Sequence, residues 1–321
     1  MKKIQVAILV VLVMMIVPVC WSAEEYPNKP IQLICPFAPG GNSDLSARVV
    51  GNKMAEMLGQ PIMVVNKPGG GSAVGINFVA GSKPDGYTLL TASAGMVLIP
   101  MITPQLPYKM EDLVPVGRVV TWNSTVVVNK DIPAKSLLEF AAYARKNPGT
   151  LSYSSSGIGN TSHFIGEWIN MEFKLDIQHI LYVGENPAMT AVVGKHAHVT
   201  YLSLPQCIPH VKSGAVTPIA VLSNKRDPEL PQVPSSAEQG YPDLIASSYH
   251  IFYAPAKIPA PILKKLETTL EKALQDKDVM KQIVDIGLTV GFLNSQDTKK
   301  FLDNEYKKWA PVAKKANIVI K

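Results

Sequence analysis

Apolar and polar positions follow one repeating order from Ile31 onward: a short apolar strand, a loop rich in Gly, Ser or Pro, and an amphipathic helix. In the first unit the strand covers 31–35, the loop 36–42 and the helix 43–58. Gly59 and Pro61 supply the helix stop. Helical spacing predicts one buried face that contains Leu45, Val49, Val50, Met54, Met57 and Leu58.

The same order continues through most of the chain. Ser136 and Glu139 form a capping-box pattern, and Pro187 stands at a favoured first position of a short helix. The expected fold class is therefore α/β, with largely parallel strands covered by helices on both faces. Further strands are predicted over 62–65, 88–91, 125–128, 151–154, 177–181, 199–202 and 217–222, with helices near 73–80, from 136 to before 147, and around Phe164, Trp168 and Met171.

The last seventy or so residues are rich in helix and show no strand-loop-helix series of their own. Ile262, Leu266, Leu270 and Leu274 recur every fourth residue. We expect the chain to cross back near 247–253, so that these helices pack on the first lobe. The predicted domains are a first lobe of 23–122 plus 250–321 and a second lobe of 123–249, with a two-strand hinge and a cleft between them.

The N-terminus has the pattern of a secretory signal peptide. Lys2 and Lys3 precede an apolar run of about sixteen residues, fewer than the ~20 that a membrane-spanning helix needs. Lipid attachment to Cys20 is disfavoured because the bulky Val19 precedes it. We therefore predict a signal peptide over 1–22, cleavage near Ser22/Ala23 and a periplasmic location.

Composition adds limits to these predictions. Roughly 300 mature residues exceed what one hydrophobic core usually serves, which favours two lobes. Removal of Lys2 and Lys3 lowers the net charge from +6 to +4, and no Lys/Arg run indicates nucleic-acid binding. Cys35 and Cys207 remain in the mature chain, where buried free thiols are favoured over a disulfide.

Two loops have the composition of anion-binding sites. One reads Pro39-Gly40-Gly41-Asn42-Ser43-Asp44 and the other Gly157-Ile158-Gly159-Asn160-Thr161-Ser162. Each places glycines and hydroxyls before a helix start, where free N–H groups and the helix dipole attract anions. Either loop alone is more often a turn or a cap. Together they indicate recognition of a carboxylate by backbone and hydroxyl groups.

Catalytic interpretations have less support. The sequence has no Gly-x-Ser-x-Gly elbow and no Walker sequence, and the second loop lacks the third Gly of a dinucleotide fingerprint. An exported hydrolase using Ser156 or Ser162 with His163 remains an alternative. His196, His198 and His210 could hold zinc, but ordinary strand-face histidines are the favoured interpretation. No cofactor and no metal are expected.

Six motifs, distributed in order over the mature chain, resemble the Bug (TctC-like) receptors, the periplasmic binding components of tripartite tricarboxylate transporters. They are 26–31 (Tyr-Pro-Asn-Lys-Pro-Ile), 36–44, 58–61 (Leu-Gly-Gln-Pro), 66–69 (Asn-Lys-Pro-Gly), 84–89 (Pro-Asp-Gly-Tyr-Thr-Leu), and Tyr182-x-Gly184-x-x-Pro187-Ala188. The resemblance implies a two-lobed fold similar to that of type II periplasmic binding proteins. It also implies a small carboxylate as ligand, either a di-/tricarboxylate or an aromatic carboxylate, and delivery to a permease of one large and one small subunit. A ligand-sensing subunit of a signalling system is a further alternative, and a monomer is expected.

By analogy with these receptors, loops near 37–44, 93, 155–162 and 182–188 grip the ligand, with ordered water sharing one carboxylate. The chain departs from the family pattern where relatives often read Gly-x-Val-Asp-Leu-x-x-Asp, because His198 and Leu202 replace the two acids. If that strand end borders the cleft, an extra carboxylate or an aromatic acid would suit it. The predicted ligand-binding residues are Phe37, Gly41, Asn42, Ser43, Asp44, Ser93, Ser156, Gly157, Asn160, Thr161, Ser162, Tyr182, Asn186, Pro187, Ala188 and Ser203.

Overall fold

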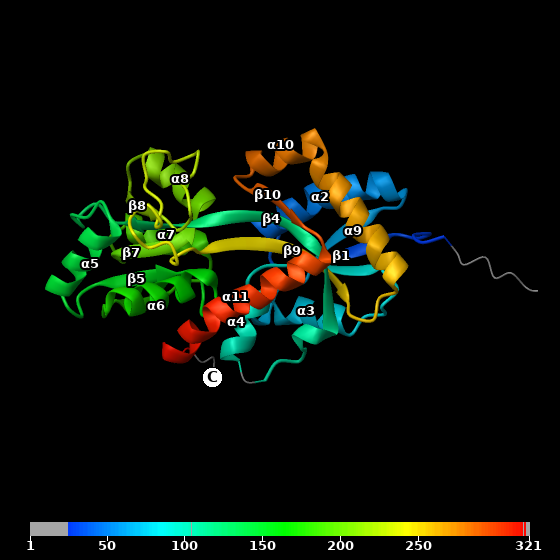
Figure 1. Cartoon of the computed structure of the whole chain (residues 1–321), viewed down its shortest axis with the longest axis horizontal. Coiled ribbons are helices and arrows are strands. Elements are labelled where there is room, and N and C mark those ends of the chain that lie inside the picture. The colour runs from blue at the N-terminus through cyan, green and yellow to red at the C-terminus, as the bar shows by residue number, and fades with distance from the viewer. Residues whose placement is uncertain (1–24, 104, 317, 319–321) are drawn as a thin grey trace, which may run out of the picture.

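The computed structural model describes residues 25–103, 105–316 and 318, and the predicted signal peptide lies outside them. Two groups of helices and strands lie side by side along the long axis of the molecule, joined by long strands between them (Figure 1). Ten strands form one sheet, in the order β2-β1-β3-β9-β4-β7-β5-β6, with β8 and β10 also paired to β4. The α/β class predicted from the sequence is confirmed.

The first group follows the predicted order closely. β1 lies between β2 and β3 and runs parallel to both. Because the chain moves outward from β1 to β2 and then back to β3, right-handed connections place α2 and α3 on opposite faces. Gly59 ends α2 with a φ of 68°, a conformation that favours glycine. Its elements are β1 (Ile31–Cys35), α2 (Asn42–Leu58), β2 (Ile62–Asn66), η1 (Gly70–Ser72), α3 (Ala73–Ala80), β3 (Thr88–Ala92), α4 (Gly95–Ile102) and η2 (Met110–Asp112).

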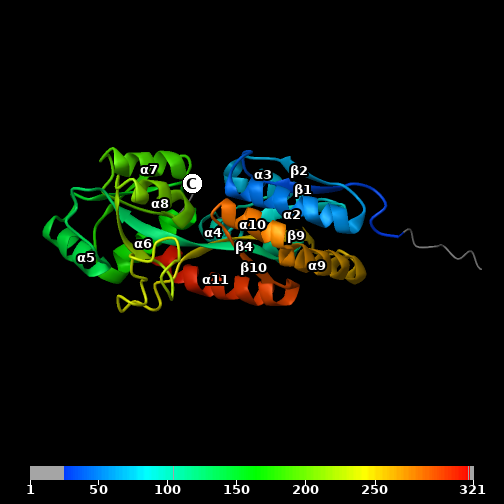
Figure 2. The ribbon, with the colours of Figure 1, turned by 90° about the horizontal axis from the view of Figure 1, so that it is seen from above.

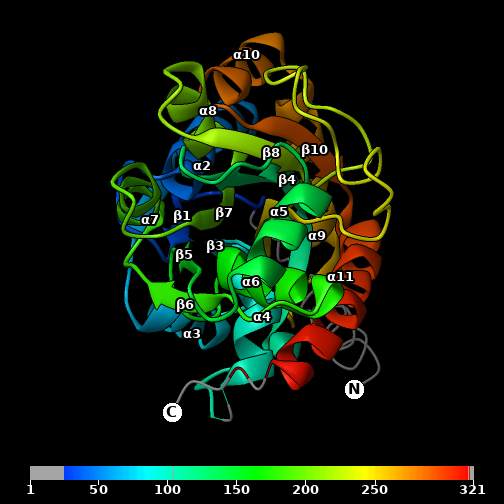
Figure 3. The same cartoon turned by 90° about the vertical axis from the view of Figure 1, so that its left-hand side faces the viewer.

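The second group repeats this arrangement, with β5 between β6 and β7 and parallel to both. α6 and α7 cover opposite faces of these strands (Figures 2 and 3). The predicted capping box is half formed: Ser136 accepts from the backbone N–H of Glu139, but the Glu139 carboxylate accepts from Lys135 instead of Ser136. Its elements are α5 (Leu137–Lys146), β5 (Ser152–Ser155), α6 (Thr161–Phe173), β6 (Gln178–Leu181), α7 (Glu185–Val193), β7 (Val199–Ser203), α8 (Leu204–Lys212) and β8 (Thr217–Val221).

Two long strands connect the groups. β4 (Leu113–Val128) pairs with β9 (Ser247–Pro255) over 113–123, with β7 over 124–128 and with β8 over 125–128. The predicted strand 125–128 is therefore only the end of a 16-residue strand. Because β4 and β9 cross in opposite directions, the middle of the sheet is antiparallel, and the expectation of largely parallel strands was correct only for its two ends. The predicted lobe boundaries fall within β4 and β9 and stay a prediction.

The C-terminal segment differs from its prediction in two ways. α9 (Ala260–Gln275) and α10 (Lys277–Asp285) pack on α2 as expected, but β10 (Thr289–Leu293) is a strand that the pattern did not indicate. α11 (Ser295–Lys315) contacts α4 of the first group and also α6 of the second. Trp309 of α11 packs edge-on against Phe164 and Trp168 of α6. α11 is thus a third connection between the groups.

The two cysteines of the predicted mature chain lie in the interior. Cys35 in β1 and Cys207 in α8 are buried and free, as the sequence favours. Burial raises the pKa of the Cys35 thiol to about 11.

Within 25–103, 105–316 and 318, none of the helices combines the length and apolar character needed to cross a membrane.

Candidate ligand-binding site

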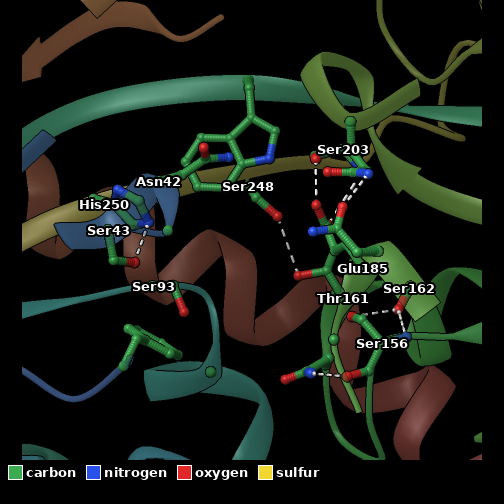
Figure 4. A pocket seen from close by; sticks show the side chains of 18 of the residues that line it. Asn42, Ser43, Ser93, Ser156, Thr161, Ser162, Glu185, Ser203, Ser248 and His250 are labelled. Atoms are coloured by element: carbon green, nitrogen blue, oxygen red, sulfur yellow. Dashed lines mark hydrogen bonds between the residues drawn. The ribbon is translucent and has the colours of Figure 1, made fainter. Parts of the chain in front are cut away.

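A cavity of about 620 Å³ lies between the two groups, next to the crossing strands β4 and β9. The first group contributes the loop after β1, the start of α2 and the residues before α4, and the second contributes the starts of α6 and α7 and the end of β7. Figure 4 shows these two walls, with β4 and β9 behind them. The lining residues are Phe37, Ala38, Pro39, Gly40, Gly41, Asn42, Ser43, Ser93, Gly95, Trp122, Ser124, Ser156, Asn160, Thr161, Ser162, Gly184, Glu185, Asn186, Tyr201, Ser203, Gln206, Ser248 and His250.

Most of the predicted ligand-binding residues lie together on this cavity, and their binding role stays a prediction. The structure brings to it Phe37, Gly41, Asn42, Ser43, Ser93, Ser156, Asn160, Thr161, Ser162, Asn186 and Ser203.

Five predicted residues do not line the cavity. Ala188 is fully buried in α7, where its carbonyl accepts from Ser154, and Tyr182 packs against the core under α7. Pro187 is exposed, and Gly157 packs so closely on Asn160 that a Cβ there would lie 2.5 Å from Nδ2. The predicted loops border the cavity, but these four positions within them do not. Asp44 is the fifth.

Asp44 anchors the first loop from below. Its carboxylate accepts hydrogen bonds from the backbone N–H of Gly40 at 3.0 Å, from Arg48 at 2.8 and 3.1 Å and from Asn66 at 2.9 Å. Asn66 also donates to the carbonyl of Phe37 at 3.0 Å. Burial opposes ionisation of Asp44, but these hydrogen bonds outweigh it and lower its pKa. The network fixes the loop whose outer side faces the cavity.

The loop before α6 is ordered by its own polar groups. Ser162 Oγ accepts from the backbone N–H of Ser156 at 3.0 Å, and Asn160 donates to the Ser156 carbonyl at 3.1 Å. α6 begins at Thr161, and the N–H groups of Thr161 and Ser162 lie beside the cavity, whereas the Asn160 carbonyl accepts from the N–H groups of His163 and Phe164. Thr161 Oγ1 accepts from Ser248 of β9 at 3.2 Å, which ties this helix start to the crossing strand.

His250 connects the cavity wall to α2. Ser46 donates to the Asn42 carbonyl at 2.7 Å, so Ser46 Oγ accepts from His250 Nδ1 at 3.0 Å. His250 Nε2 then accepts from Ser43 Oγ at 2.7 Å. Trp122 packs edge-on against the imidazole at 4.7 Å between ring centroids. Burial lowers the pKa of His250 to about 3, so the ring is neutral and orients Ser43.

The arrangement required by the hydrolase alternative is not formed. His163 Nδ1 accepts from the backbone N–H of Gly159 at 3.3 Å, and its ring stacks on His179 at 4.1 Å. Ser156 and Ser162 are hydrogen bonded to each other at 3.0 Å, and His163 does not line the cavity. Burial, with a smaller effect of His179, lowers the pKa of His163 to about 4.

The predicted departure at His198 and Leu202 does not border the cavity. Leu202 is fully buried among α7 and α8 residues, and His198 Nδ1 accepts from the Ser152 backbone N–H at 3.0 Å. Across the described ranges, no cluster of three His, Cys, Asp or Glu side chains could bind a metal, so the structure does not bring His196, His198 and His210 together. The two replaced positions therefore do not reach the cavity, although Tyr201 and Ser203 at the end of the same strand do.

Twelve lining residues are absent from the predicted set, and five of them, Ala38, Pro39, Gly40, Gly184 and Glu185, lie within the predicted loops. Trp122, Ser124, Ser248 and His250 belong to the crossing strands, and only tertiary structure places them in the cavity. Tyr201 and Gln206 flank Ser203, and Glu185 opens α7 within the predicted loop. The position of Glu185 at a strand-to-helix connection was a usable signal, since ligands bind beyond the carboxyl ends of parallel strands.

Two α/β groups joined by crossing strands, with a cavity between two helix starts, define a two-lobed solute-binding protein. Residues 46–318 match the model of the TctC family, described as the tripartite tricarboxylate transporter family receptor, and the chain belongs to this family. The family's receptors are periplasmic. The resemblance inferred from the sequence motifs is thereby confirmed.

Individual relatives agree with this assignment. Protein BugT of Bordetella pertussis is 33% identical over 303 residues, covering 94% of this chain and 93% of BugT. The structure of Rpa4515 of R. palustris with adipate superposes with a TM-score of 0.82 at 28% identity, covering 92% of this chain and 99% of that one. MatC of Rhodopseudomonas palustris with bound malate gives 0.77 at 27% identity, covering 89% and 99%.

Proposed function

We propose that this protein captures a small carboxylate between its two lobes and delivers it to the permease of a tripartite tricarboxylate transporter. The observation that carries the proposal is the meeting of two helix starts, those of α2 and α6, at one cavity. N–H groups and the dipole of each helix favour an anion there. No Lys or Arg is among the described lining residues, so backbone and hydroxyl groups are the donors.

The ligands of two relatives support the chemical class. Rpa4515 was solved with adipate and MatC with malate, both dicarboxylates. The cavity of about 620 Å³ exceeds the volume of either acid, which leaves room for the ordered water that commonly bridges such ligands. A larger carboxylate, including an aromatic one, also fits this volume.

Lobe closure would signal that ligand is bound. A ligand touching both walls favours the closed state, because only that state makes all of the contacts. The walls already meet beside the cavity, where a Cβ at Gly159 would lie 2.6 Å from Ile102 of α4. The proposal also includes export with cleavage near Ser22/Ala23. It further includes action as a monomer and recognition by the large and small permease subunits.

A thermal-shift screen of the mature protein with C4–C6 di- and tricarboxylates and aromatic acids tests this function. We expect at least one acid to raise the melting temperature in a concentration-dependent way, without turnover. Asn160→Ala or Thr161→Ala should weaken that ligand, whereas Asn52→Ala, on the exposed side of α2, should not. Product release from an ester panel without any ligand stabilisation would favour the hydrolase instead.

A further inference from the structure

Glu185 is the only carboxylic acid among the described residues that line the cavity, and no lining Lys or Arg balances it. It is the first residue of α7, on the wall that faces Asn42, Ser43 and His250 (Figure 4). The rest of the lining consists of hydroxyls, amides, aromatic rings, one imidazole and backbone. A carboxyl group is an unexpected neighbour for an anionic ligand.

The carboxyl group is held in one orientation. Ser203 donates from its backbone N–H to Oε1 at 3.3 Å and from Oγ to Oε2 at 2.5 Å. Each carboxylate oxygen has a further lone pair available after accepting one hydrogen bond. The two bonds therefore fix Glu185 while leaving acceptor capacity beside the cavity. Gln206 and Asn186, hydrogen bonded to each other at 2.6 Å, line the cavity next to it.

The surroundings of Glu185 affect the ionisation of its carboxyl group in opposite directions. Burial raises the pKa of Glu185 above the ordinary glutamate value, and the hydrogen bonds from Ser203 oppose this rise only in part. The N-terminus of α7 also favours a negative charge at its first residue. When the lobes close and water leaves, a carboxylate without a cationic or further hydrogen-bonding partner would be costly, which favours a ligand that brings a compensating group.

We propose that the ligand carries a hydrogen-bond donor, an ammonium or hydroxyl group, at the end that reaches Glu185, while its carboxylate binds at the helix starts. This inference rests on the proposed function and specifies its ligand. A second carboxylate at this end would meet a like charge and bind only with a shared proton. Glu185 is therefore a specificity-determining residue that disfavours simple dicarboxylates.

The test uses matched ligands that differ only at one end. Isothermal calorimetry at neutral pH would compare 6-aminohexanoate, 6-hydroxyhexanoate, adipate and hexanoate, and the corresponding four-carbon series. The proteins are wild type, Glu185→Gln and the control Glu172→Gln, which makes the same change at an exposed position of α6. Melting temperatures without ligand verify folding, and Gln keeps an oxygen to accept from the Ser203 N–H.

In wild type and Glu172→Gln, we expect one of the donor-bearing acids to bind more tightly than the dicarboxylate of equal length. Glu185→Gln should weaken the donor-bearing acid about tenfold and strengthen the dicarboxylate, because a charged acceptor becomes neutral. A preference of wild type for the dicarboxylate, or an unchanged order in Glu185→Gln, would overturn this inference alone. If no acid of either series bound and the broader acid screen also failed, the proposed function would fall with it.

Discussion

Ser43, in the first turn of α2, donates a hydrogen bond to Nε2 of His250 in β9, with 2.7 Å between the two atoms. The residues are 207 positions apart in sequence, and both line the cavity. The bond therefore joins the start of α2 in the first group to the crossing strand β9.

Ser43→Ala should therefore destabilise the protein, because the buried Nε2 of His250 loses its donor. We expect a loss of about 1–3 kcal/mol in the free energy of unfolding, measured by urea titration. Ser213→Ala, an exposed serine at the end of α8, should change it by less than about 0.5 kcal/mol. Equal effects of the two changes would contradict the role assigned to the Ser43–His250 bond.

Stability should fall as pH decreases below about 6.5, the ordinary histidine value. The pKa values of the buried His163 and His250 are lowered to about 4 and about 3 in the folded state, so between these values and 6.5 the unfolded chain binds more protons. Linkage then lowers the unfolding free energy by up to about 1.4 kcal/mol per pH unit for each histidine. Urea titrations between pH 7.5 and 5 measure the slope. His163→Gln should flatten it, and an unchanged slope would count against a buried neutral His163.

Asp44→Asn should loosen the loop after β1. The substitution removes the charge that accepts from Gly40, Arg48 and Asn66, and we expect about 1–3 kcal/mol of lost stability with several-fold weaker carboxylate binding. Asp131→Asn is a matched control, because its ion pair with Lys195 is exposed on both sides and contributes about 0–1 kcal/mol. Calorimetry of both variants would contradict the anchoring role if their affinities were alike.

Trp309→Ala should uncouple α11 from the second group. Trp309 is 1% exposed and fits between Phe164 and Trp168, so truncation should cost about 3–5 kcal/mol. Hydrogen exchange should become faster in α6 as well as in the end of α11. Tyr306→Ala, half exposed on the same helix, provides the comparison. Faster exchange confined to α11 would show that this contact does not join the two groups.

The sequence by itself determined most of the local elements and their order. Val50 and Met54 lie on the buried face of α2 as predicted, although Met57 of the predicted face is 44% exposed. The Gly59 stop reflects a backbone preference that acts within a few residues. The loops at 36–44 and 155–162 could be predicted as candidate anion-binding loops for the same reason, since each helix start lies next to the glycines and hydroxyls of its loop.

Only the tertiary structure decided what stands opposite those loops. Trp122 and His250 reach the cavity because β4 and β9 cross between the groups, and β10 forms because β4 offers it an edge. Asp44 lies within the predicted motif, yet it turns under the loop toward Arg48 and Asn66. Side-chain direction, strand crossing and the pairing of Glu185 with Ser203 depend on contacts between distant segments, which no local pattern of residues contains.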